Sequence, residues 1–309
     1  MVAALLADLF ETHRPHLFSV AYRLTGSVSD AEDAVQESWL RLAVARQYEI
    51  EDLRAWLTTV VSRICLDRLR SAAARREQYV GQWLPEPIVT SATPSSTPDP
   101  LAAVVRKQEF RFAALVVLDT LTPPQRVAFV LHDGFAVPFD EIAEILDISA
   151  DAARQLAVRA RKAAAAAPEP VTDDTHRAAV ERLLAALAGG DVNAVVAALH
   201  PGIRTVGDAG GTASTAINVV AGVDNNTRLW MGLWKRFGPA ETESAGRGQE
   251  FEPVLVNGQL GILSHEFASY DGLPGSPQRV YGFTVVEGRV WGIYDLVNPS
   301  KLTGIRLPH

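Results

Sequence analysis

The sequence is poor in cysteine, in long apolar runs and in positive charge, and each scarcity excludes a class of protein. Its one cysteine, Cys65, has no partner for an internal disulfide, and its apolar neighbours Ile64 and Leu66 predict a buried thiol. No apolar run approaches the roughly 20 residues that span a bilayer. The first residues also lack the basic start of a secretory signal. We therefore expect a cytoplasmic protein with no membrane partner.

Positive charge is scarce because 29 Lys and Arg face 36 Asp and Glu, which gives a net charge of −7. The N-terminal residues 1–78 hold 10 basic against 11 acidic side chains, and residues 101–167 hold 8 of each. A protein that finds nucleic acid by bulk electrostatics is strongly basic. Either the chain does not bind DNA, or a partner supplies much of the attraction and this chain adds only local contacts.

The chain does contain clear boundaries between segments. Residues 84–100 include five prolines and show no apolar periodicity, which predicts a linker. Pro168 and Pro170 follow a run of alanines and should end the helix before them. The predicted organisation is a helical domain over 1–78, a linker over 79–105, a second helical domain over 106–167 and a third domain over 174–309.

The third segment changes from helical to strand patterns. Apolar residues at helical spacing predict one helix over 175–188, and a second is expected near 191–199. Turn signals such as Asn257-Gly258 and Glu287-Gly288 separate alternating segments further on. The strands are expected at 251–257, 260–268, 279–287 and 289–297. Helices followed by a strand meander predict an α+β domain with a curved antiparallel sheet.

Residues 139–162 have the pattern of a helix-turn-helix. Asp147-Ile148 forms the short turn, and Ser149 is positioned to cap the second helix. The outer face of that helix carries donors suited to the DNA major groove, where Arg binds guanine and Gln binds adenine. These candidates are Arg154, Gln155, Arg159, Arg161 and Lys162. The alternative is an ordinary helical hairpin with a solvated basic face.

The N-terminal half resembles a known family at three places. AEDAVQESWLRL at 31–42 resembles the region 2 helix by which sigma factors dock on the clamp helices of the RNA polymerase β′ subunit. LRAWLTTVVSRICLDRLR at 53–70 resembles the helices that open and recognise the −10 promoter element. The helix-turn-helix at 139–162 is similar to region 4, which recognises the −35 element. Short regions 2 and 4 joined by a linker are typical of the extracytoplasmic-function (ECF) group.

The resemblance implies two partners, core RNA polymerase (its β′ clamp helices and β flap) and promoter DNA. It also accounts for the low charge, because the polymerase brings its own DNA channel. Polymerase contacts are expected from Asp30, Glu32, Asp33, Gln36, Glu37 and Trp39, and −10 contacts from Trp56, Arg63, Arg68 and Arg70. Trp56 would stack on an unpaired base. A core position is the alternative for Trp56, and a solvated helix face is the alternative for the acids.

The rest of the chain resembles the subgroup with a C-terminal SnoaL-like domain of the NTF2-like superfamily, the sigma-J type. YVGQWLPEP at 79–87 resembles the subgroup's linker signature, and NPSKL at 298–302 resembles its terminal NPxKL motif. DAGGT at 208–212 meets a DGGGK-like loop in part, because the lysine is missing. We expect a regulatory interdomain contact from Trp83, Leu84, Pro85, Glu86, Pro87, Asp208, Asn298, Pro299, Lys301 and Leu302. A passive spacer is the alternative for the linker motif.

The predicted fold is thus two all-α sigma domains and a cone-shaped α+β domain of the SnoaL-like type. Some NTF2-like relatives move protons with pocket carboxylates or histidines, and His200, Asp208, His265 and Asp295 are the groups available here. Nothing in the sequence pairs an acid with a base, so we expect no catalytic residues, cofactor or metal, and leave open a small ligand in the pocket. The competing functions are a helix-turn-helix regulator that binds DNA alone and an enzyme. Residues 31–70 favour the sigma factor, because a repressor has no use for them.

Overall fold

The computed structural model describes residues 2–76, 79–93, 111–165, 168–169, 171–238, 250–269 and 275–307. The chain divides into two compact units. Unit 1 comprises Met1–Gln78, Pro98–Phe110 and Ala114–Ala167, and unit 2 comprises Tyr79–Thr97, Arg111–Ala113 and Pro168–His309. Residues 94–105 of the predicted linker, and the start of the second predicted helical domain at 106–110, lie outside the described residues.

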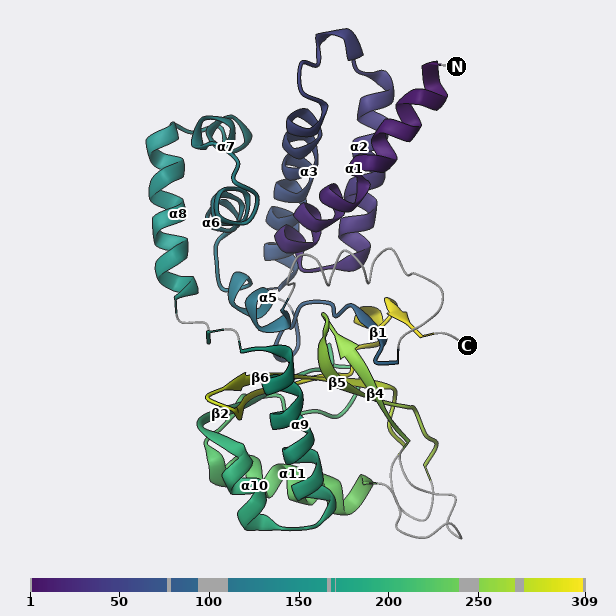
Figure 1. Ribbon diagram of the computed structural model, residues 1–309, viewed down its shortest axis with the longest axis vertical. Helices are drawn as coiled ribbons and strands as arrows, with labels where there is room; N and C mark the ends of the chain where they lie inside the picture. Colours follow the sequence, from purple (N-terminus) through teal and green to yellow (C-terminus); the bar gives the residue numbers. More distant parts are fainter. Residues whose placement is uncertain are drawn as a thin grey trace. The chain divides into compact units, whose positions relative to one another are not determined.

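The N-terminal part of unit 1 is a group of three long helices (Figure 1). They are α1 (Val2–Thr25), α2 (Val28–Val44) and α3 (Leu53–Arg76), with a short 3-10 helix, η1 (Gln47–Glu49), before α3. Each long helix packs against the other two, and buried side chains such as Tyr22 and Leu57 fill the space between them. Cys65 is buried here as predicted, and this burial raises the pKa of its thiol.

The helix-turn-helix expected at 139–162 is present. The helices of this part of the chain are α5 (Phe112–Leu118), α6 (Pro123–Phe129), the π-helical turn η2 (Val130–Gly134), α7 (Phe139–Leu146) and α8 (Ala150–Ala164). Asp147 ends α7 in the left-handed conformation, with φ of 58°. The Ser149 hydroxyl caps α8 by accepting the Ala152 N–H at 3.2 Å. Ala153, Ala157 and Ala160 are buried, and their small side chains let α8 lie close to its neighbours.

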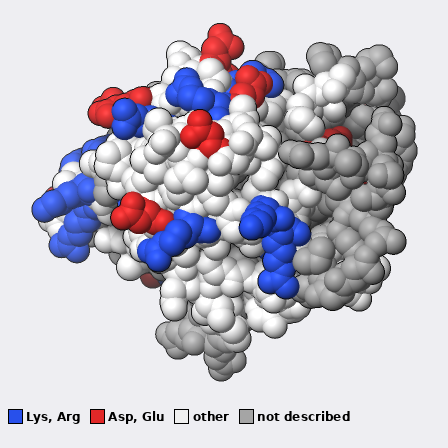
Figure 2. All heavy atoms as spheres, turned by 90° about the horizontal axis from the view of Figure 1, so that it is seen from below, with Lys and Arg blue, Asp and Glu red and all other residues white. Residues whose placement is uncertain are grey.

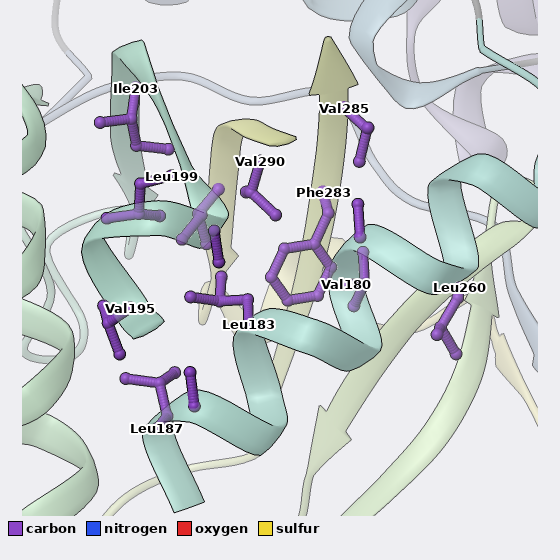
Figure 3. Close-up of a cluster of buried hydrophobic side chains, with 14 of the residues drawn as sticks. Val180, Leu183, Leu187, Val195, Leu199, Ile203, Leu260, Phe283, Val285 and Val290 are labelled. Carbon is purple, nitrogen blue, oxygen red and sulfur yellow. The ribbon is translucent and has the colours of Figure 1, made fainter. Parts of the chain in front are cut away.

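Three helices of unit 2 cover one face of its sheet (Figure 1). They are α9 (Asp173–Ala188), α10 (Val192–Ala198) and α11 (Val223–Phe237), of which the first two were predicted. Leu183 and Leu187 of α9 belong to a buried cluster that also contains Phe283 and Val290 of the sheet (Figure 3). Burial of this apolar surface stabilises the packing of the helices on the sheet.

The sheet has eight strands in the order β3-β2-β7-β6-β5-β4-β1-β8. Their bounds are β1 Val89–Ser91, β2 Leu199–Asp208, β3 Val220–Ala221, β4 Phe251–Val256, β5 Gln259–Ser264, β6 Arg279–Val286, β7 Arg289–Leu296 and β8 Ile305–Arg306. The four predicted strands correspond to β4–β7, although β5 ends at Ser264 and not at residue 268. Asn257 and Glu287 have φ of 50° and 51°, so both predicted hairpin turns form.

The expectation of an antiparallel sheet was wrong, because the sheet is mixed. Strand β2 pairs with β7 in parallel, and β1 pairs with β8 in parallel. The pattern of β2 is interrupted by Pro201 and Gly202, which hid it in the sequence. Strand β1 lies within the predicted linker and pairs with β4 on its other side. The result is an α+β domain, the class that the SnoaL-like resemblance implies, with an added strand from the linker.

The lower face of the molecule carries mixed charge. Figure 2 shows basic and acidic side chains interspersed among uncharged ones on the described surface of this face. A surface of this kind lacks the single-sign field that attracts a nucleic-acid backbone. No helix within the described ranges is long and apolar enough to cross a membrane.

Candidate functional site

Helix α8 presents all five predicted −35 residues to solvent. The Arg154 guanidinium donates to the Asp151 carboxylate at 2.5 Å and lies over the Phe139 ring, and Arg161 Nε donates to Asp133 at 2.6 Å. Within the described part of the chain, the side chains of Gln155, Arg159 and Lys162 have no hydrogen-bond or ion-pair partner. These three can bind a ligand without first losing a partner, whereas Arg154 and Arg161 must exchange one.

The predicted −10 residues lie along α3. Trp56 is half-buried, so part of its side chain remains accessible to solvent. Arg63 is exposed, and its Nη2 donates to the Glu144 carbonyl of α7 at 3.0 Å. That carbonyl belongs to the last turn of α7, where backbone acceptors have no partner within the helix. Arg63 thus joins α3 to the helix-turn-helix within unit 1.

A second contact joins the same parts of unit 1. The Arg126 side chain of α6 is 2 % exposed, and its Nη1 donates to the Leu24 carbonyl of α1 at 2.9 Å. Its other nitrogens donate to the Leu118 carbonyl and to the Asp119 carboxylate. A buried, fully bonded guanidinium is costly to separate from its acceptors. Neither contact was predictable, since the partners are 81 and 102 positions apart.

Arg68 pairs with three of the acids that were expected to contact the polymerase. Its Nη1 lies 2.9 Å from Asp30 and 3.4 Å from Asp33, and its Nη2 lies 3.9 Å from Glu37. Arg68, which was expected at the −10 element, therefore neutralises part of the acidic face of α2. Arg70 pairs with Asp67 at 3.6 Å in the same helix.

A cavity of about 310 Å³ opens between α1 and α2 beside that acidic face. Gln36 and Trp39, two of the predicted polymerase residues, line it together with Phe10. The Phe10 and Trp39 rings are 5.2 Å apart, and Leu40 at the cavity is 64 % exposed. Glu11 and Arg14, which pair at 3.3 Å, also line it, so this partly exposed apolar surface is suited to an apolar side chain of a protein partner.

In unit 2 the three subgroup motifs meet at Asp208, the last residue of β2. Its carboxylate is fully buried and accepts three donors. The Leu84 N–H donates to Oδ2 at 2.7 Å, Lys301 Nζ donates to Oδ2 at 2.6 Å, and the Tyr79 hydroxyl donates to Oδ1. Burial, followed by the bond to Asp208, raises the pKa of Tyr79. We call this set the linker site, defined by Tyr79, Trp83, Leu84, Asp208, Asn298 and Lys301.

Lys301 fixes the linker motif from the other side. Its ammonium also donates to the Leu84 carbonyl at 2.5 Å and lies 3.2 Å from the centre of the Trp83 ring. Both backbone groups of Leu84 are therefore bonded to the C-terminal domain. A buried lysine with a carboxylate, a carbonyl and an aromatic face around it forms a specific, desolvated contact.

The remaining motif residues extend this contact. Asn298 Nδ2 donates to the Tyr79 hydroxyl at 2.8 Å, and Asn298 caps the short η3 helix (Pro299–Lys301). Thr303 donates to the buried Glu86 at 3.3 Å. Leu302, like Pro85 and Pro87, is buried nearby. The structure therefore brings together the residues that were expected to act at an interdomain contact, and adds Tyr79 and Thr303.

The loop after Asp208, which matches the DGGGK-like motif in part, needs a glycine because its backbone passes close to Asn298. Gly210 has φ of +56°, and a Cβ there would lie 2.6 Å from Asn298 Nδ2. Thr212, at the position of the missing lysine, closes the turn by donating its N–H and hydroxyl to the Ala209 carbonyl at 2.9 Å and 2.7 Å. Gly210 is thus required by the linker site, and Thr212 shapes the loop without a charge.

A cavity of about 650 Å³ lies between α9, α11 and the sheet of unit 2. Trp230, Trp234 and Phe251 line its apolar side, and Asp295 and Arg279 line its polar end. Of the four groups considered for proton transfer, only Asp295 is among the described lining residues. His200 accepts the Gly202 N–H at 3.0 Å, and His265 pairs with Glu252 at 3.2 Å.

The chain is similar to known proteins over nearly its whole length. The sequence model of sigma-70 region 2 matches residues 9–75, and that of sigma-70 region 4 matches residues 111–163. The ECF RNA polymerase sigma factor SigJ of Mycobacterium tuberculosis is 52% identical over 298 residues, which are 96% of this chain and 92% of SigJ. The probable ECF RNA polymerase sigma factor SigI of the same species is 33% identical over 304 residues, 96% of this chain and 94% of SigI. A crystal structure of M. tuberculosis SigJ superposes with a TM-score of 0.81 at 48% identity, covering 98% of this chain and all of that chain (100%).

Proposed function

The chain belongs to the ECF RNA polymerase sigma factors, and on that premise we propose that it directs transcription initiation from a specific promoter while its own C-terminal domain controls this activity. The observation that carries the proposal is the linker site, where a buried Asp208–Lys301 pair at 2.6 Å holds both backbone groups of Leu84. The controlling segment and the controlled regions are then parts of one chain, as a cis-acting control requires.

Region 4 recognises the −35 element through α8. Arg159 and Gln155 contact base edges, because both are exposed on α8 and without a partner among the described residues. Arg154 joins them once it leaves Asp151, 2.5 Å away. Arg161 and Lys162, near the C-terminal end of the helix, bind phosphates and set its orientation on the duplex.

Region 2 provides the other contacts. Trp56 and Arg63 of α3 act on the −10 element, with Arg68 and Arg70 on phosphates. Trp39 and Gln36, with the acids Asp30, Glu32, Asp33 and Glu37, dock on the β′ clamp helices, and region 4 reaches the β flap. The acids attract basic groups, and the cavity between α1 and α2 accepts an apolar side chain of the partner.

The arrangement within unit 1 is not the promoter-bound one. The −10 and −35 elements are about 25 base pairs apart, which is roughly 85 Å of duplex at 3.4 Å per base pair. Arg63, assigned to the first element, contacts α7 of the helix-turn-helix at 3.0 Å. Because both helices cannot bind such distant elements while they touch, this contact and that of Arg126 with Leu24 are lost when the chain joins the polymerase on DNA.

The linker site controls this separation. The segment 79–91, from Tyr79 to the end of β1, is held by unit 2 through side-chain contacts and strand pairing. At about 3.5 Å per extended residue, this segment represents roughly 45 Å of reach between regions 2 and 4. While the segment is docked, regions 2 and 4 cannot use this length to move apart. After its release, they can. The C-terminal domain therefore acts as a regulator and not as an enzyme, in a cytoplasmic protein.

Run-off transcription with core RNA polymerase tests this proposal. The full chain is compared with Lys301→Ala, with chains truncated near Asp173 or lacking the last dozen residues, and with Lys235→Ala as an exposed lysine control. We expect Lys301→Ala to yield several-fold more product than the full chain and Lys235→Ala to leave the yield unchanged. If none of these proteins associates with the polymerase, the sigma assignment is wrong. If Lys301→Ala associates but transcribes like the full chain, control through the linker site is wrong.

A further inference from the structure

Helix α8 carries an exposed valine on the face that holds its hydrogen-bond donors. Val158 is 55 % exposed, and Arg154 and Lys162 lie one helical turn before and one turn after it. Gln155 and Arg159 are exposed beside it on the same helix. A branched apolar group therefore lies at the centre of a surface made of basic and amide donors.

The packing of α8 does not account for this valine. The buried side of the helix is formed by the small side chains of Ala153, Ala157 and Ala160. Val158 is the only β-branched residue in the sequence of α8, where alanine recurs at many other positions. Valine is a poorer helix former than alanine, because its branched side chain loses rotamer freedom in a helix. Neither burial nor helix stability therefore favours valine at this exposed position.

The stiffness of the valine side chain favours recognition of a ligand. In a helix, valine takes one χ1 rotamer in about 90% of cases, so its two methyl groups point in fixed directions before a partner arrives. A longer apolar side chain, such as methionine, would lose more conformational entropy when it is held in a contact. Val158 is thus prepared for a short-range contact with a second apolar group.

The charges around Val158 indicate the kind of partner. Arg159 and Lys162 are exposed and hold no ion pair among the described residues. No acidic side chain follows Asp151 in α8. The major groove of DNA offers phosphate and base acceptors to these groups, and it presents one apolar group among them, the C5 methyl of thymine. A surface that combines basic donors with a rigid apolar centre is suited to that combination.

We propose that Val158 recognises a thymine of the −35 element by packing against its C5 methyl group, and so adds specificity to the hydrogen bonds of the neighbouring donors. The proposal rests on the assignment of α8 to the −35 element. Val158 follows Arg154 by four residues, which is about 6 Å along a helix at 1.5 Å per residue. At 3.4 Å per base pair, the thymine then lies within about two base pairs of the one that Arg154 contacts.

Replacement of thymine by uracil tests the contact, because it removes the C5 methyl and keeps the base pair. The full chain with core polymerase selects its −35 sequence from duplexes that are randomised in this element. Each thymine of the selected sequence, on either strand, is then replaced by uracil. We expect one replacement to weaken binding about fourfold, which is the effect of burying one methylene group. No effect of any replacement overturns the proposal.

The variant Val158→Ala assigns this effect to the valine. Alanine is the better helix former, so the variant should fold, and the sensitive replacement should weaken its binding less than about 1.5-fold. Val158→Ile retains a branched apolar side chain and should retain the fourfold effect. Val192→Ala removes an exposed valine of α10 and is the matched control, which should behave like the wild type. An equal effect of uracil in Val158→Ala and in the wild type overturns the proposal.

5-Methylcytosine provides the converse test. Cytosine at the recognised position lacks the methyl, and 5-methylcytosine differs from it by the methyl alone. We expect the wild type to bind the methylated duplex about fourfold more tightly, and Val158→Ala to bind both duplexes equally. Equal binding of both duplexes by the wild type overturns the proposal.

Binding to core polymerase without DNA separates this contact from a protein interface. We expect Val158→Ala and the wild type to bind the polymerase equally tightly, because the proposed partner of Val158 belongs to DNA. Weaker binding by the variant would place Val158 against the polymerase and overturn the proposal. If the wild type with polymerase selects no −35 sequence, the sigma assignment itself fails. If it selects one whose thymine methyls have no effect, only the role of Val158 fails.

Discussion

Replacement of Lys301 by methionine should release the linker from the C-terminal domain without unfolding it. Lys301 is 5 % exposed, and Lys301→Met keeps the length of its side chain while removing the ammonium that bonds to Asp208 and to the Leu84 carbonyl. Breaking one side of a buried ion pair costs about 3–5 kcal/mol. The Leu84 N–H and the Tyr79 hydroxyl still donate to Asp208, so the lower end applies. About 3 kcal/mol corresponds to a roughly 100-fold shift in the docking equilibrium.

Amide hydrogen exchange measures this shift directly, because the Leu84 N–H is itself a donor to Asp208. We expect protection of Leu84 to fall roughly 100-fold, while the amide of Ile293 in the middle of β7 keeps its protection. Adding Asp208→Asn to Lys301→Met should recover part of the loss, since no buried charge then remains unpaired. Unchanged protection at Leu84 would refute the role of the ion pair. An equal loss at Leu84 and Ile293 would show that the whole unit was destabilised.

Three other changes test the sigma regions. Arg159→Ala should weaken binding to the −35 sequence of this sigma factor by about 1–3 kcal/mol and reduce discrimination at one base pair. Gel-shift assays with polymerase measure both effects. A uniform loss of binding across −35 sequences would instead place Arg159 on phosphate. Trp56→Ala should reduce permanganate reactivity of the −10 region at equal polymerase occupancy, and unchanged reactivity would assign Trp56 to the core. Burial and, next, the charge of Arg54 lower the pKa of His16 from 6.5 to about 4. The folded state thus takes up this proton less readily than the unfolded state, so the stability that His16 contributes is complete above pH 6.5 and declines toward pH 4. The urea midpoint should fall less in His16→Gln than in the wild type between pH 7 and pH 5, and equal falls would contradict this.

The local parts of the fold were predictable from the sequence. Ser149 caps α8, Asp147 supplies the left-handed residue of the turn, and Asn257 and Glu287 form the hairpin turns, because each depends on neighbours within a few positions. The resemblance to the sigma-J type was enough to name the motif residues of the linker site. Their mutual contacts could not be predicted, because Tyr79 and Asp208 are 129 positions apart.

The long-range features show why the rest was missed. Strand β2 finds its partner β7 in parallel, and no local pattern specifies a parallel neighbour. Arg68 was assigned to the −10 element by resemblance, and its contact with Asp30, 2.9 Å away in the folded helices, was not predicted. A side chain on a helix face has several partners within reach, and only the packing of α2 on α3 selects among them.

Release of the linker would also lower the solubility of the protein, because strand β1 leaves the sheet with it. Strand β1 fills the position between β4 and β8, where Val89 pairs with Val256 on one side and Ile305 on the other. Once it leaves, β4 presents a row of unpaired N–H and C=O groups beside apolar side chains, which is the kind of border that adds strands from other chains. An undocked molecule is therefore prone to self-association in proportion to its concentration. A molecule that stays undocked for long would tend to aggregate, unless another segment pairs with β4 in place of β1.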